Sequence, residues 1–147
     1  MPRASFRTHV LIKAPQEGVF DYVSDLSRHG EWTSDPVEIT VVESTPQKIG
    51  DRYRSIAQSH GVTFRSELVV TEYNPPVQFA FVGQDSTGRV EHRFTFHAHG
   101  EDTRVERRMQ FDVNLVQWLA YLAVVYPARI PSARRTLQLL KTKLEQS

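Results

Sequence analysis

The stretch at residues 89–113, RVEHRFTFHAHGEDTRVERRMQFDV, decides how this chain folds. Apolar and polar residues alternate on both sides of a turn at Gly100-Glu101-Asp102. Such alternation is typical of a strand with one buried face. Because the connection is short, the two strands must pair antiparallel. The stretch therefore predicts a hairpin of strands 89–99 and 103–113.

The same alternation extends over most of the remaining chain. It begins at Phe6, Thr8, Val10 and Ile12, which predicts a first strand. After Pro36, turn residues such as His60-Gly61, Asn74-Pro75-Pro76 and Ser86-Thr87-Gly88 separate the apolar segments. Short connections indicate an antiparallel meander. We expect its earlier strands at 37–43, 51–59, 62–73 and 77–83.

Helical spacing appears at both ends of this meander. A helix is expected from Pro15, which suits a first turn because its missing N–H would be unpaired there. A second short helical piece is expected at 26–32, broken at Gly30. Leu137, Leu140 and Leu144 predict a C-terminal helix. Pro127 and Pro131 are expected to kink or break it from the apolar segment that precedes it.

Length, net charge and amino-acid composition exclude several classes of protein and site. The 147 residues fit one domain, 1–147, and a formal net charge of +1 gives no bulk attraction for nucleic acid. Cysteine is absent, which excludes disulfides, thiolate metal sites and a cysteine nucleophile. The longest apolar run, Trp118 to Tyr126, is far short of the ~20 residues that span a bilayer. With no signal peptide pattern, a cytoplasmic location is expected.

The order of these elements, together with the short sequence motifs in them, resembles the START/SRPBCC superfamily, in particular its polyketide cyclase/dehydrase-like branch. The likeness covers nearly the whole chain. It is carried by Ile12-Lys13-Ala14-Pro15, Val19-Phe20-Asp21-Tyr22-Val23-Ser24-Asp25, Glu31-Trp32, Ile49-Gly50-Asp51-Arg52-Tyr53, Thr71-Glu72-Tyr73-Asn74-Pro75-Pro76 and Phe79-Ala80-Phe81.

The resemblance implies an α+β helix-grip fold. A curved antiparallel sheet would wrap around a long C-terminal helix, with two short helices after the first strand. It also implies a cavity between sheet and helix for a lipid, polyketide or other hydrophobic small molecule. No cofactor is implied. His97 and His99 share a strand face without an obvious third ligand, so no metal site is expected.

Strand alternation indicates which side chains face this cavity. Polar groups embedded in apolar stripes are the candidates for orienting a ligand, and aromatic residues are the candidates for its walls. The predicted ligand-binding residues are Trp32, Tyr53, Phe64, Ser66, Phe79, Phe81, His92, Phe94, Phe96, Arg107, Met109, Phe111, Trp118, Tyr121 and Leu122.

Three of these are also candidate catalytic residues. Arg107 needs a partner in an apolar setting, either a bound carboxylate or carbonyl or an acid of the protein. His92 suits general acid–base chemistry because its unperturbed pKa is near neutrality. Tyr53 could help to orient a carbonyl. The structural alternatives stay open: Arg107 at a sheet edge, His92 as a satisfied core residue, and the aromatics as packing.

Three functions follow from this. The first is binding or transport of a hydrophobic small molecule such as a lipid or polyketide. The second is a cofactor-free aromatase/cyclase or dehydrase acting on a polyketide-like substrate. The third is a non-catalytic protein that uses the segment from Leu115 to Tyr126 as a homodimer interface or at a membrane surface.

Overall fold

The computed structural model describes residues 3–33, 36–59, 61–85, 88–112 and 126–146. Within this part of the chain, a seven-stranded sheet has the order β1-β7-β6-β5-β4-β3-β2, and every neighbouring pair is antiparallel. The elements are β1 (Arg3–Ile12), α1 (Gln16–Ser24), the 3-10 helix η1 (Leu26–Glu31), β2 (Val37–Glu43), β3 (Arg52–Ser59), β4 (Val62–Asn74), β5 (Gln78–Asp85), β6 (Gly88–His99), β7 (Asp102–Asp112) and α3 (Tyr126–Glu145).

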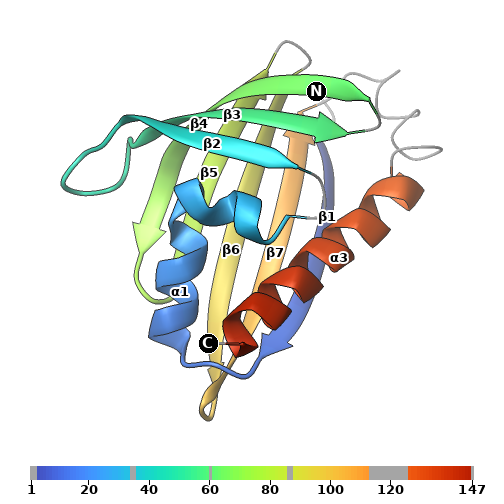
Figure 1. Cartoon of the computed structure of the whole chain (residues 1–147). Coiled ribbons are helices and arrows are strands. Elements are labelled where there is room, and N and C mark those ends of the chain that lie inside the picture. The colour runs from blue at the N-terminus through green and yellow to red at the C-terminus, as the bar shows by residue number, and fades with distance from the viewer. Residues whose placement is uncertain (1–2, 34–35, 60, 86–87, 113–125, 147) are drawn as a thin grey trace.

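The sheet is strongly curved. In Figure 1, β2 and β3 fold over from the rest of the sheet, and α3 runs diagonally across the concave face beside β1. The first strand in sequence pairs with the last, with Val10 opposite Val105. The meander, the two short helices after the first strand and the long C-terminal helix confirm the predicted helix-grip fold.

Helix α1 is attached to the sheet through its first turn. Pro15 occupies the N-cap position, where an absent N–H leaves nothing unpaired. The Nε2 group of Gln16 donates to the carbonyl oxygens of Pro76 and Phe96, both at 3.1 Å. The buried face of the helix, which includes Phe20 and Val23, then packs against the sheet. This contact closes one end of the concave face.

The 3-10 helix η1 lies directly against β2 because Gly30 has no side chain. A Cβ atom at Gly30 would lie 2.5 Å from the carbonyl oxygen of Val37, closer than real contacts allow. The expected helical interruption at Gly30 is therefore a close approach of two backbones, and η1 continues through it to Glu31. This packing brings His29 and Trp32 into the interior.

Helix α3 differs from the sequence-based expectation at Pro131. The helix runs unbroken from Tyr126 to Glu145 with Pro131 inside it. Proline removes a single i→i−4 hydrogen bond here, while the buried leucines Leu137 and Leu140 hold the helix on the sheet. The apolar segment before Tyr126 lies outside the described residues. No helix in the described ranges is long and apolar enough to cross a membrane.

The concave face has two contrasting ends. The filled end is defined by Ile12, Phe20, Phe96, Val105 and Leu140, none of which is more than 1% exposed. It lies toward the C-terminus of α3 and the β6–β7 turn, at the bottom of Figure 1. The hollow end is defined by Ser55, Ala57, Ser66, Gly83 and Ala133, which surround empty space.

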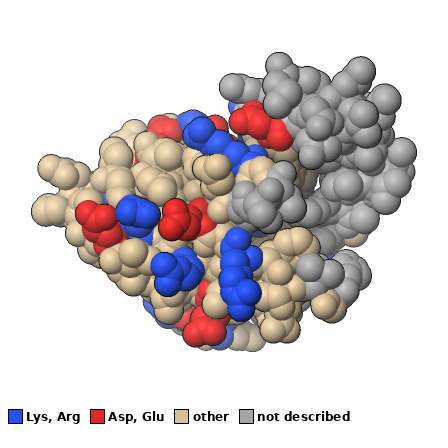
Figure 2. Space-filling view, turned by 90° about the horizontal axis from the view of Figure 1, so that it is seen from above, with Lys and Arg blue, Asp and Glu red and all other residues tan. Residues whose placement is uncertain are grey.

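The surface carries charges of both signs. In Figure 2, Lys and Arg side chains are interspersed with Asp and Glu over the described part of the face shown. Several charged side chains of the described chain form pairs, as in Arg28 with Glu31 at 3.2 Å and Arg93 with Glu91 at 3.1 Å. Exposed pairs of this kind contribute little to stability, about 0–1 kcal/mol each. They leave no continuous basic area on the described part of this face.

Candidate functional site

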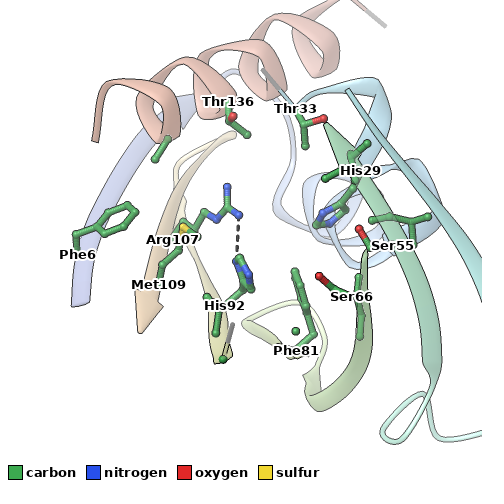
Figure 3. A pocket seen from close by; sticks show the side chains of 18 residues that line it. Phe6, His29, Thr33, Ser55, Ser66, Phe81, His92, Arg107, Met109 and Thr136 are labelled. Carbon is green, nitrogen blue, oxygen red and sulfur yellow. Dashed lines mark hydrogen bonds between the residues drawn. The ribbon is translucent and has the colours of Figure 1, made fainter. Parts of the chain in front are cut away.

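A cavity of about 280 Å³ lies at the hollow end, between the sheet and α3 (Figure 3). Strands β1 to β7, the η1 region and α3 all contribute to its wall. The described lining residues are Phe6, His29, Thr33, Val37, Ile39, Ser55, Ala57, Ser66, Leu68, Phe81, Gly83, Gly88, Val90, His92, Arg107, Met109, Ala133 and Thr136.

Small side chains create the space. Ser55 of β3 lies opposite Ser66 of β4, and Gly83 of β5 lies opposite Leu68. A Cβ atom at Gly83 would lie 3.1 Å from Leu68 Cδ2, so even alanine would crowd this point. On the helix side, Ala133 presents only a methyl group. The cavity therefore exists because the side chains at these positions are small, and the strand pairing around them is regular.

Two polar side chains meet on one wall of the cavity. Arg107 Nη2 lies 3.1 Å from His92 Nδ1. Arginine can only donate, so Nδ1 accepts and the His92 ring is in the neutral, Nε2-protonated form. The ring also stacks on Phe81, with centroids 4.6 Å apart and an interplanar angle of 10°. This stacking and the hydrogen bond fix the orientation of His92.

Arg107 is the buried charge of the site. Desolvation lowers its pKa to about 10, so the guanidinium stays protonated at neutral pH. Its carbon Cζ lies 5.4 Å from the centroid of the Phe94 ring, a cation–π contact. Its Nε is covered by protein atoms and has no acceptor among the described residues. In Figure 3 the guanidinium points into the cavity, toward Thr136.

His29 faces the same cavity from η1. Its Nε2 lies 3.0 Å from the Val23 carbonyl oxygen, so Nε2 carries the proton and donates. The ring packs against Trp32 at a centroid distance of 4.5 Å. Burial is the main cause that lowers the pKa of His29 to about 3, and the positive charge of Arg107 lowers it further. His29 is therefore a neutral wall residue at physiological pH.

The structure divides the predicted ligand-binding residues into three groups. Those that line the cavity are Ser66, Phe81, His92, Arg107 and Met109. Those that lie outside its lining, either packed in the interior or beside it, are Trp32, Tyr53, Phe64, Phe79, Phe94, Phe96 and Phe111. Trp118, Tyr121 and Leu122 lie outside the described residues.

The three candidate catalytic residues are not all in one place. His92 and Arg107 are in direct contact. Tyr53 instead lines a separate hollow with Asp21, Lys48 and Asp51. Burial raises the pKa of its phenol, and the nearby Asp51 raises it further. The geometry therefore supports joint chemistry for the Arg107–His92 pair alone.

Most wall residues absent from the prediction are small or come from other elements. Ser55 and Ala57 share an inward strand face whose small side chains signal space rather than packing. Val90 lies two residues before His92 on β6 and therefore on the same inward face. By contrast, nothing in the local pattern signals His29, Thr33 or Thr136, because helix and loop residues reach the cavity only through the tertiary fold. The others are Phe6, Val37, Ile39, Leu68, Gly83, Gly88 and Ala133.

Solved structures share this architecture at low sequence identity. The Zhui aromatase/cyclase from Streptomyces sp. R1128 superposes with a TM-score of 0.80 at 11% identity, covering 99% of this chain and 95% of that one. A START superfamily protein from Mycobacterium smegmatis gives 0.78 at 16% identity, covering 97% of both chains. The di-domain aromatase/cyclase StfQ of the steffimycin pathway gives 0.76 at 13% identity, covering 98% of this chain and 51% of that one.

At these identities the structural likeness establishes the fold. Comparison with curated proteins gives no significant match. A family model described as "polyketide cyclase / dehydrase and lipid transport" matches residues 3–145, nearly the whole chain. The helix-grip fold, the cavity between sheet and helix, and this match agree, and the chain belongs to the polyketide cyclase/dehydrase and lipid-transport family within the START-like fold.

Proposed function

We propose that this protein binds a hydrophobic small molecule in the cavity at the hollow end. The observation that carries the proposal is the cavity itself, about 280 Å³ bounded by the sheet, η1 and α3 and partly open to solvent. Apolar walls with a few converging polar groups are typical of ligand sites. Phe6, Val90 and Met109 supply the apolar surface, while Arg107 and His92 supply the polar groups.

The volume limits the size of the ligand. Small-molecule sites span roughly 300–1,000 Å³, so this cavity is at the lower limit. A lipid with two long acyl chains is larger than this space and could not lie wholly inside it. A single medium-length chain or a small aromatic compound fits the available space.

Binding can be tested with N-phenyl-1-naphthylamine, an uncharged fluorescent probe. We expect saturable binding to the wild-type protein at one site. The double variant Ser66→Leu/Ala133→Leu fills the cavity from opposite walls and should weaken binding by at least about 10-fold, or about 1.4 kcal/mol. The variant Gln138→Leu adds a leucine to the exposed face of α3 and should bind like the wild type.

Circular dichroism and thermal melting would verify that the double variant stays folded. If a folded double variant binds the probe as tightly as the wild type, the cavity is not the binding site. If the wild type binds neither this probe nor any of a panel of fatty acids, quinones and aromatic polyketides, the proposed function is wrong.

The Arg107–His92 contact supports a second candidate, a cofactor-free cyclase or dehydrase. Arg107 could polarise a carbonyl oxygen, and the neutral His92 ring could transfer a proton. A poly-β-keto substrate analogue would be incubated with the wild type, Arg107→Gln and His92→Gln. Turnover that falls about 100-fold or more in either variant, with probe binding retained, would support catalysis. Equal rates in all three proteins would exclude these roles.

A further inference from the structure

Arg107 is a buried cation whose partners do not neutralise it. Within the described ranges its one hydrogen bond is donated to Nδ1 of His92, which can accept only while the ring is neutral. Among the described residues no carboxylate forms an ion pair with Arg107, and desolvation alone accounts for the change in its pKa. Its Nε group adds a buried donor with no acceptor in the described part of the chain.

The sequence supplies few acids that could fill this gap. Residues 113–125, VNLVQWLAYLAVV, contain no Asp or Glu. The acidic residues whose side chains lie outside the described part of the chain are Asp35 and Asp85. An unpaired buried charge is costly, whereas pairing it with a carboxylate through charge-assisted hydrogen bonds recovers much of that cost.

We propose that the ligand is a small monocarboxylate whose anionic group pairs with Arg107 and whose apolar part occupies the rest of the cavity. This inference rests on the proposed binding function and specifies its ligand class. The outer guanidinium nitrogens point into the cavity, so a carboxylate can approach them end-on. One cation in a largely apolar cavity matches a monoanion better than a phosphate dianion.

The walls beyond Arg107 indicate the shape of the apolar part. Val90 and Met109 lie next to the polar pair, and Ala57 and Ile39 lie on the opposite wall. The cavity of about 280 Å³ is partly open to solvent, so the far end of a ligand can extend toward the opening. A saturated acid of medium chain length, such as decanoate, or a small aromatic acid suits this space.

The test is displacement of N-phenyl-1-naphthylamine at pH 7.5 by decanoate, decanol and decyl phosphate. These share one chain and differ in the head group. We expect decanoate to bind about 10- to 100-fold more tightly than decanol, the range that a charge-assisted hydrogen bond supplies. Decyl phosphate should bind more weakly than decanoate. Equal affinity for decanoate and decanol, or tighter binding of the phosphate, would overturn the proposal.

Two substitutions tie the preference to Arg107. Arg107→Met should abolish the preference for decanoate, keep or improve decanol binding, and raise the Tm of the ligand-free protein because an unpaired charge is removed. Arg107→Lys retains the charge without the planar fork and should keep only part of the preference. A preference that survives in Arg107→Met would show that another group binds the carboxylate.

Asp35→Asn and Asp85→Asn, made separately, test for an internal counter-ion. We expect each variant to keep the wild-type preference and Tm. If either variant instead lowers the Tm and strengthens decanoate binding, that aspartate is the natural partner of Arg107 and the proposal fails. These outcomes differ from failure of the proposed function, in which the uncharged probe itself would not bind to the cavity.

Discussion

The filled end and the hollow end of the concave face share strands β1, β6 and β7 and helix α3, yet one is solid and the other is empty. Strand β6 shows the change within one element. Phe96 and Phe94 are no more than 1% exposed and pack against other aromatic rings, while His92 and Val90 further along the same face border the cavity. Backbone pairing is regular in both regions.

Side-chain volume and not backbone geometry therefore separates the two ends. At the filled end, rings interlock edge to face, as Phe20 does with Phe96 at a centroid distance of 5.2 Å. At the hollow end, the facing positions are Ser, Ala and Gly, which cannot reach across. Between the ends lies a polar boundary of Thr8, Arg107 and His29. The difference shows how one scaffold combines a stable core with space for a ligand.

The largest expected effect comes from truncating a side chain at the filled end. Phe96→Ala removes a fully buried ring and should lower the free energy of unfolding by about 3–5 kcal/mol. Met109→Ala at the hollow end should cost only about 1–2 kcal/mol, because Met109 already faces empty space on one side. Urea denaturation of both variants measures the difference. Equal losses would show that the two ends are packed alike.

A smaller loss of folding stability is expected when the pH is lowered, because of His29 at the polar boundary. Burial lowers its native-state pKa to about 3, below the ordinary value of 6.5, and neighbouring Arg107 acts in the same direction while Asp25 and the Val23 carbonyl oppose it. Below pH 6.5 the unfolded chain therefore binds a proton that the native state does not. Stability should fall as pH drops, by about 2 kcal/mol from this group between pH 7 and pH 5.

Urea denaturation at pH 7, 6 and 5 measures this loss for the wild type and for His29→Gln. The glutamine amide can still donate to the Val23 carbonyl oxygen but does not titrate, so its loss over this range should be about 2 kcal/mol smaller. His99→Gln removes an exposed histidine and is the matched control, expected to follow the wild type. Identical pH dependence of wild type and His29→Gln would contradict this account.

The smallest effect concerns two threonines of the inner face. Thr8 Oγ1 is buried without a partner among the described residues, whereas Thr103 Oγ1 donates to the Ala14 carbonyl oxygen at 2.8 Å. Thr8→Val should stabilise the protein by about 0.5–1 kcal/mol, and Thr103→Val should destabilise it by about 1 kcal/mol. Thermal melting of the two variants shows whether each substitution stabilises or destabilises the protein. A destabilised Thr8→Val would reveal a partner for Thr8 at the boundary.

Residues of the candidate site could be predicted from the sequence only where they lie on strands with a clear alternation of inward and outward side chains. His92, Arg107 and Met109 were found because polar or bulky residues within an inward stripe stand out. Aromatic residues such as Phe94 and Phe96 fit the same pattern but fill the core, because alternation gives the direction of a side chain and not the space beyond it. Tyr53 faces inward at a different hollow for the same reason.

The sequence by itself determined the order of elements and the antiparallel meander, because local alternation, turn residues and helical spacing act over a few neighbouring residues, and its family resemblance implied the helix-grip fold. Only the tertiary structure decided where the interior stays empty. It places His29 and Thr136 in the cavity wall and brings His92 within hydrogen-bond distance of Arg107. It also lets helix α3 continue past Pro131. Cavities and buried contacts depend on how side-chain volumes from distant segments add up, and no local pattern records that sum.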